Sequence, residues 1–277
     1  MIQWFPGHMV KARREIESNI KLVDVVIMLL DARAPIACRN PELENMIRKK
    51  QLLLVLNKVD LADARATARH RQMLKKEGYM VASMDSLHGR GSKKVLELIQ
   101  QAYAPQATQM LKKGRRVRPV RVMVVGVPNV GKSTFLNCLA GRKIARVGEK
   151  PGITRGKQWL RIRDDIELLD TPGLMWPKIE DEKQGLKLAL LNIIGENAYQ
   201  DYDVALYLVE LLKERHPVIL QERYRVEDIT LPVEDILAAI AVTRGLLQKG
   251  GEPNLDQTSR LVLQEYRRGM MGAISLE

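Results

Sequence analysis

The sequence predicts an α/β domain, with a mostly parallel β-sheet covered by helices on both faces, followed by a smaller all-helical domain. In residues 1–178, short apolar runs alternate with amphipathic segments, which is typical of parallel strands buried on both sides. A glycine-containing loop of the phosphate-binding type joins one of these runs to a helical segment. After Lys178 the strand-like runs stop, and we therefore divide the chain into domains 1–178 and 179–277.

The first half of the chain alternates continuous apolar runs with charged or amphipathic segments. We expect buried strands within 24–35, 52–60 and 79–86, and helices within 41–50, 63–77 and 91–103. The last of these helices places Val95, Leu98, Ile99 and Ala102 on one face.

The remaining segments are an N-terminal arm, a linker and further regular elements. We expect the arm at 1–20, a basic linker with Pro and Gly at 104–119, a strand–loop–helix unit at 120–141 and a hairpin at 159–173. Four amphipathic segments separated by Pro and Gly follow, at 185–199, 204–217, 233–251 and 254–269.

The composition is that of an ordinary globular protein without a membrane segment. Of the 277 residues, 45% are hydrophobic, but no apolar run approaches the ~20 residues that span a bilayer. The N-terminus lacks the apolar segment of a secretion signal, so we expect a cytoplasmic protein, and a monomer. Cys38 and Cys138 lack metal-site spacing and are expected to be packed thiols in a reducing compartment.

Positive charge is concentrated in the first two thirds of the chain. The net charge is +12, whereas residues 181–277 hold 11 Lys or Arg and 16 Asp or Glu, or −5, which leaves +17 in residues 1–180. The stretch 112–121 has six basic residues and no acidic one, and 142–163 has eight basic residues and one acidic. A soluble surface needs no such clustering, so the pattern favours a polyanionic partner.

The segment "GVPNVGKS", 126–133, is a phosphate-binding loop of the form GxxxxGK(S/T). Gly126 and Gly131 permit the tight loop, whose N–H groups, including those of Val130 and Thr134, are expected to surround the phosphates. Lys132 is expected to reach the β- and γ-phosphates, and Ser133 to bind Mg²⁺.

The segment "NKVD", 57–60, indicates guanine recognition. The Asp60 carboxylate accepts hydrogen bonds from two guanine N–H donors, and adenine lacks this pattern. Asn57 can bridge the base and the phosphate loop, and the Lys58 stem can cover the base. In "SMDS", 83–86, Ser83 and the Met84 N–H are expected beside the guanine carbonyl.

A third motif, "DTPG" at 170–173, is typical of the turn that senses the γ-phosphate. Asp170 is expected to hold Mg²⁺ through water, and the Gly173 N–H to contact the γ-phosphate. Thr154 is expected to close over the same Mg²⁺. Asn129 in the phosphate loop either binds K⁺ near the phosphates or only stabilises its own turn.

The order of these motifs is unusual, because the guanine motifs precede the phosphate loop. In Ras-like proteins the phosphate loop, the threonine loop and DxxG come first and the guanine motifs follow, so the domain is predicted to be a circularly permuted P-loop GTPase. This order, together with "DARAP" (31–35) and "WFPGHM" (4–9), resembles the YlqF or ribosome biogenesis GTPase A family. The resemblance implies Mg²⁺-dependent GTP hydrolysis, assistance to late assembly of the bacterial large ribosomal subunit, and a helical domain that contacts rRNA. An acidic domain is poorly suited to contact rRNA, so the acidic residues of 179–277 do not fit that last implication. The charge distribution instead makes residues 1–178 the main electrostatic contact.

The residue after "DTPG" is Leu174, where Ras-like GTPases have a glutamine that orients the attacking water. The resemblance implies this hydrophobic replacement, and His8 is the catalytic candidate that the sequence offers in its place, on a turn made by Pro6 and Gly7. A surface histidine without a catalytic role is the equally weighted alternative. For the whole protein, the alternative is a GTP-sensing regulator that acts on a protein partner without RNA contact.

Overall fold

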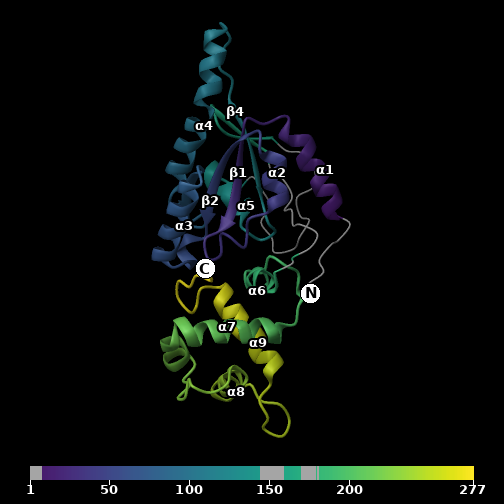
Figure 1. Ribbon diagram of the computed structural model, residues 1–277, viewed down its shortest axis with the longest axis vertical. Helices are drawn as coiled ribbons and strands as arrows, with labels where there is room; N and C mark the ends of the chain where they lie inside the picture. The colour runs from purple at the N-terminus through teal and green to yellow at the C-terminus, as the bar shows by residue number, and fades with distance from the viewer. Residues whose placement is uncertain (1–7, 144–158, 170–178, 180) are drawn as a thin grey trace. The chain divides into compact units, whose positions relative to one another are not determined.

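The computed structural model describes residues 8–143, 159–169, 179 and 181–277, and it leaves out the side chains of residues 8–12 and of Glu196 (Figure 1). The chain divides into two compact units. One ends at Lys178 and also includes Glu277, and the other includes Ile179–Leu276. Each unit is described by itself below.

The first unit is built on a mostly parallel sheet. Its six described strands have the order β3-β2-β1-β4-β6-β5, and only β5 is antiparallel to its neighbour. The strands are β1 (Val25–Asp31), β2 (Gln51–Asn57), β3 (Met80–Met84), β4 (Val120–Gly126), β5 (Trp159–Arg163) and β6 (Ile166–Leu169). The predicted strands and the predicted hairpin at 159–173 are thereby confirmed in the described residues.

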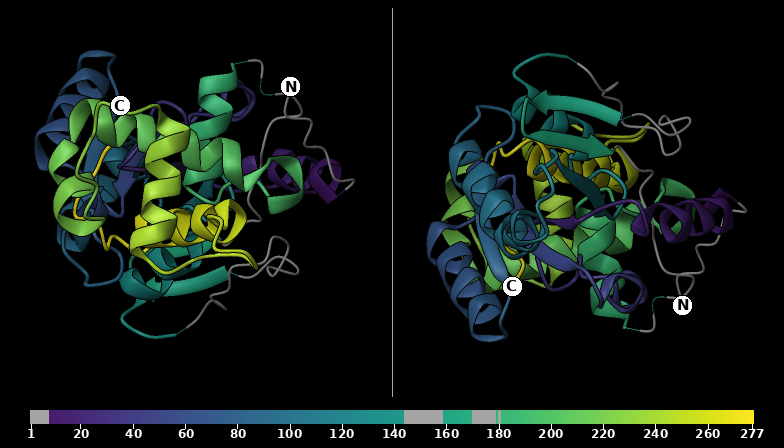
Figure 2. Two further views of the ribbon diagram at one scale, coloured as in Figure 1. Left: turned by 90° about the horizontal axis from the view of Figure 1, so that it is seen from below. Right: turned by 90° about the horizontal axis from the view of Figure 1, so that it is seen from above.

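Helices pack on both faces of this sheet (Figures 1 and 2). They are α1 (His8–Ile20), α2 (Pro41–Ile47), α3 (Ala64–Lys76), α4 (Ser92–Lys112) and α5 (Lys132–Ala140). All seven residues of β1 are buried, as expected for a central strand covered on both faces. The α/β fold class predicted for this part of the chain is therefore correct.

Helix α4 corrects the predicted linker at 104–119. The helix continues through Pro105 to Lys112, because a proline removes only one backbone hydrogen bond and tertiary contacts hold the next turn. The Tyr103 hydroxyl donates to the Arg118 carbonyl at 3.2 Å, and Gln106 Nε2 donates to Asp24 at 2.9 Å. Only residues 113–119 connect the helix to β4.

The N-terminal arm expected at 1–20 is helical from His8 onwards, with Ile16 and Asn19 fully buried. The expectation that His8 lies on a loop is therefore wrong: its backbone begins α1. Burial of one face of this helix, which includes Ile16 and Asn19, stabilises it through tertiary contacts. A proline restricts the residue before it, so the turn signal of Pro6 and Gly7 does not prevent a helix from beginning at His8.

The second unit is helical in its described residues. It contains α6 (Glu182–Leu190), α7 (Asp201–Arg215), α8 (Val233–Thr243) and α9 (Leu255–Arg267), with short 3₁₀ and π turns at Glu196–Ala198 and Ile219–Arg223. Three helices, α6, α8 and α9, are shorter than their amphipathic segments, and α8 ends two residues before Gly245, whose φ is +67°. In the part of the chain that the structure describes, no helix combines the length and apolarity needed to span a membrane.

Candidate nucleotide-binding site

The motifs that were singled out in the sequence meet at the carboxyl edge of the parallel sheet. In the strand register, Asp31 lies beside Asn57 and Asn57 beside Met84, while Leu29 of β1 lies beside Gly126 of β4. Four strands thus end in one row, and the loops that follow them share this edge. Ligands of open α/β sheets bind outside such carboxyl ends.

The phosphate loop needs glycine at both of its glycine positions. Gly126 has φ +153°, and a Cβ there would lie 2.7 Å from the Leu29 carbonyl oxygen. Gly131 has φ +100°, and a Cβ there would lie 2.6 Å from Asn57 Nδ2. Both residues combine a positive φ with a close approach to a neighbouring strand or loop, so any side chain would displace the loop.

Helix α5 begins at Lys132, directly after the loop. Lys132 Nζ donates to the carbonyl oxygens of Gly126 at 3.2 Å and Val127 at 2.9 Å, which holds its positive charge over the loop. Ser133 and Thr134 follow in the first turn and are half-buried. The N-terminus of a helix carries unpaired N–H groups and a partial positive charge, so this arrangement suits a phosphate.

Two residues of the NKVD segment tie the end of β2 to the phosphate loop. Asn57 Nδ2 donates to the Val130 carbonyl at 2.9 Å, and the Ser86 hydroxyl donates to Asn57 Oδ1 at 2.6 Å. Lys58 Nζ donates to the Asn129 carbonyl at 2.8 Å. Lys58 and Asn129 both have a left-handed backbone, with φ of +59° and +55°. The two motifs therefore form one bonded unit.

Asp31 is a site residue that the sequence analysis used only as part of the DARAP resemblance. It is fully buried at the end of β1, and its Oδ2 lies 3.1 Å from Lys58 Nζ and 2.8 Å from Arg33 Nη2. Burial by itself would raise the pKa of Asp31, but Arg33 and Lys58 outweigh it and hold that pKa well below its usual range. A carboxylate that ends a buried strand next to the NKVD strand was the available signal.

The other guanine-motif residues follow Asn57 in the chain or lie at the end of the neighbouring strand β3. Asp60 is exposed within the short turn Val59–Leu61, and Met84 ends β3 fully buried. The Ser83 hydroxyl is buried without a hydrogen-bond partner among the described residues. Asp85, which follows Met84, accepts from the N–H groups of Leu87 and His88, each at 3.0 Å.

Several expected site residues fall outside the described residues. These are Thr154, Asp170, Gly173 and Leu174, together with the side chain of His8. Both cysteines are free thiols, and Cys38 is buried beside Asp31, where burial and the nearby carboxylate raise its thiol pKa. Neither is placed among the residues of the phosphate loop.

Known proteins resemble this chain along its whole length. A family described as "50S ribosome-binding GTPase" matches residues 121–241. The ribosome biogenesis GTPase A of Bacillus cereus is 42% identical over 100% of this chain and 94% of that protein. The mitochondrial ribosome-associated GTPase 1 of Xenopus tropicalis is 32% identical, over 99% and 94%. The structure of GNP-bound YlqF from T. maritima superposes with a TM-score of 0.68 and 29% identity, over 96% of this chain and 97% of that one. The motif order, the fold and these full-length similarities show that the chain belongs to the ribosome biogenesis GTPase A (YlqF) family of circularly permuted GTPases.

Proposed function

We propose that this GTPase assists assembly of the large ribosomal subunit as a nucleotide-dependent switch whose hydrolysis is stimulated by the ribosome. The observation that carries the nucleotide part is the bonding of the NKVD segment to the phosphate loop, through Asn57 to Val130 and Lys58 to Asn129. One bound nucleotide can touch both segments, so they respond to it together. The names of the relatives support the ribosomal part.

Guanine is read by Asp60, with Ser83 and the Met84 N–H beside the carbonyl of the base. The Asp60 carboxylate accepts from the two N–H donors on one edge of guanine, and adenine leaves it unpaired. The Lys58 stem covers the face of the base in our proposal, and its ammonium is held by Asp31 and the Asn129 carbonyl. Asn57 keeps this half of the site in register with the phosphate loop.

The phosphates lie in the loop 126–133 with Mg²⁺ as the cofactor. The N–H groups of Val130, Gly131 and Thr134 point to them in our proposal, and Lys132 balances their charge. Ser133, Thr154 and Asp170 supply hydroxyl and carboxylate oxygens, the ligands that suit Mg²⁺, with Asp170 acting through water. When bound there, Mg²⁺ would neutralise the charge that develops on the phosphates. The Gly173 N–H senses the γ-phosphate.

Leu174 leaves the attacking water without a glutamine, and we propose His8 as the group that orients it on the ribosome. A histidine can accept or donate a hydrogen bond near neutral pH. His8→Ala is expected to keep GTP affinity and to lower ribosome-stimulated turnover by roughly 10²-fold. A variant that binds subunits normally and keeps full stimulated turnover would remove His8 from the mechanism and leave K⁺ at Asn129 or an rRNA group as the better answer.

The decisive measurement is GTP hydrolysis with purified large subunits, with purified small subunits and with neither. We expect stimulation by large subunits only, and cosedimentation with them when a GTP analogue is bound. Absence of both effects at low salt would overturn the ribosomal proposal and leave a GTP-sensing regulator of a protein partner. The basic clusters in residues 1–180 favour the ribosomal reading over that alternative. We place the protein in the cytoplasm as a monomer.

A further inference from the structure

The amino edge of the sheet, opposite the nucleotide site, gathers exposed positive charge from four helices. In a parallel sheet, each helix that leads into a strand ends at the edge where that strand begins. Helices α1 to α4 precede β1 to β4 in this way, and each ends in an exposed lysine at or within two residues of its last residue. The four lysines are Lys21, Lys49, Lys76 and Lys112.

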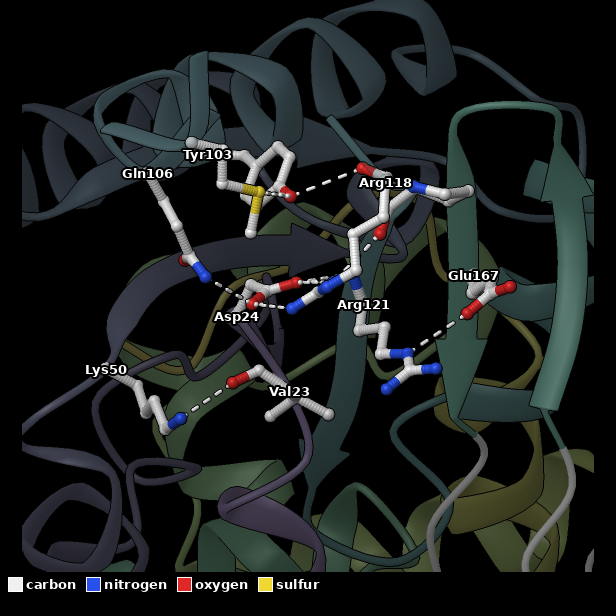
Figure 3. A network of polar contacts seen from close by, with 10 residues as sticks. Val23, Asp24, Lys50, Tyr103, Gln106, Arg118, Arg121 and Glu167 are labelled. Atoms are coloured by element: carbon white, nitrogen blue, oxygen red, sulfur yellow. Dashed lines mark hydrogen bonds and ion pairs between the residues drawn. The ribbon is translucent and has the colours of Figure 1, made fainter. Parts of the chain in front are cut away.

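The acidic groups at this edge are already paired within the protein. Asp24 accepts two hydrogen bonds from Arg118, at 2.7 and 2.8 Å, and one from Gln106 at 2.9 Å (Figure 3). Arg121 reaches Glu167 at 3.2 Å, as Figure 3 also shows. These acids therefore neutralise residues of the sheet edge itself, and they leave the more exposed cations unbalanced.

The strongest concentration lies at the end of α4, and we call Lys112, Lys113, Arg115 and Arg116 the α4 tip. All four side chains are exposed, and none makes an ion pair within the described residues. The helix ends through Gly114, with φ +66°, whose N–H bonds to the Leu111 carbonyl at 2.9 Å. In Figure 1 this end of α4 extends past the strands. The α4 tip thus carries four exposed positive charges on a backbone that is held by the end of the helix.

The returning segment is also held in place. Tyr103 is buried, and its hydroxyl donates to the Arg118 carbonyl at 3.2 Å, while Arg118 is held by Asp24 (Figure 3). A groove of about 640 Å³ lies beside it, lined by Arg116, Arg161, Asp164 and Asp165 among others. Arg161 and Asp164 lie 3.5 Å apart, so the groove balances much of its own charge and carries no separate ligand site.

Helix electrostatics explain only part of this pattern. A cation in the last turn of a helix is stabilised by the negative end of the helix dipole, which accounts for Lys112 of α4 and Lys76 of α3. That effect falls off beyond the last turn, where Arg115 and Arg116 lie. Four mutually repelling charges in five residues lower stability unless an anion binds them.

We infer that the α4 tip binds the sugar–phosphate backbone of RNA, an assignment that rests on the proposed ribosomal function. Arginine forks match phosphate oxygens, and four neighbouring cations suit a row of phosphates better than a single anion. Strand β1 has seven residues, so the two edges of the sheet are roughly 20 Å apart, and the α4 tip, which extends past the strands, lies farther than this from the nucleotide loops. RNA and GTP therefore occupy opposite edges of the domain and do not compete.

The test replaces all four α4-tip residues by Gln in the full chain. The matched control replaces Arg65, Arg69, Arg71 and Lys93 by Gln, which removes the same charge from exposed positions on α3 and α4 away from the tip. Filter binding to transcribed 23S rRNA is measured from 50 to 300 mM KCl, and thermal unfolding checks that each variant is folded. We expect the tip variant to lose at least ~10-fold in affinity at 100 mM and its salt slope to fall by about 3, against little change in the control.

Two outcomes would overturn the inference. One is an rRNA affinity and salt slope of the folded tip variant that equal those of the control, and the other is tighter binding of the parent to anionic phospholipid vesicles than to rRNA. A parallel cosedimentation with large subunits separates this inference from the proposed function. Failure of the parent chain to cosediment contradicts the ribosomal function, whereas equal cosedimentation of parent and tip variant contradicts only the role of the α4 tip.

Discussion

Replacing Asp31 by Asn tests whether the buried carboxylate organises the nucleotide site. The Arg33 side chain is 3% exposed and the Asp31 side chain 0%, so the substitution leaves a guanidinium in the interior without its counter-charge. Breaking a buried ion pair from one side costs about 3–5 kcal/mol of the free energy of unfolding. The same substitution removes the carboxylate that lies 3.1 Å from Lys58 Nζ. We expect GTP affinity to fall about tenfold, as loss of one charge-assisted hydrogen bond implies.

Native-state hydrogen exchange of the β1 and β2 amides at pH 7 measures the stability of this unit without averaging over the helical one. Because the pKa of Asp31 is lowered on folding, its contribution is fully present above the unfolded value of about 3.9 and is lost as the pH falls below it, so neutral pH reports the whole effect. Glu167→Gln is the matched control. Its partner Arg121 is 42% exposed, and such a pair contributes at most about 1 kcal/mol.

A double variant separates stability from binding. Asp31→Asn with Arg33→Met removes both buried charges, so most of the lost stability is expected to return, because apolar replacements of buried pairs are often neutral. GTP affinity is expected to stay low, because Lys58 still lacks its carboxylate. An Asp31→Asn protein within about 1 kcal/mol of the parent and with unchanged GTP affinity would refute the reasoning.

Three further predictions concern the loops of the site. Asp60→Asn is expected to shift the nucleotide preference from GTP to xanthine nucleotides. An unchanged GTP affinity of the variant in a nucleotide-competition assay would contradict this prediction. Ser133→Ala is expected to raise the Mg²⁺ concentration needed for half-maximal hydrolysis, so an unaltered Mg²⁺ titration would exclude Ser133 as a ligand. Gly91→Ala should lower the unfolding temperature more than Gly78→Ala: both have φ +92°, but a Cβ on Gly91 would overlap the Ser83 carbonyl oxygen, and one on Gly78 meets no atom within 4 Å. The backbone term common to both is about 1–2 kcal/mol, and equal melting points would show that β3 can shift.

The sequence by itself determined the fold class and the chemistry of each motif, because both depend on short-range patterns. Buried strands such as 52–60 appear as continuous apolar runs, and the loop 126–133 carries its glycines and lysine at fixed spacing. The permuted order of these motifs needed no coordinates either. The ends of regular elements were harder to predict: α4 continues through Pro105 and α1 begins at His8. In both cases buried contacts between distant segments outweigh a local turn signal.

The tertiary structure alone decided which side chains act on one another across the sheet. Asp31 and Lys58 are separated by a helix and a strand in the chain, and only the parallel register of β1 and β2 brings them to 3.1 Å. The basic stretch 112–121 likewise appears uniform as a sequence. Folding pairs Arg118 with Asp24 and Arg121 with Glu167, and leaves the charges of the α4 tip exposed. Charge is a property of composition, but its neutralisation depends on distance, and distances between remote residues are fixed only when the strands pair and the helices pack.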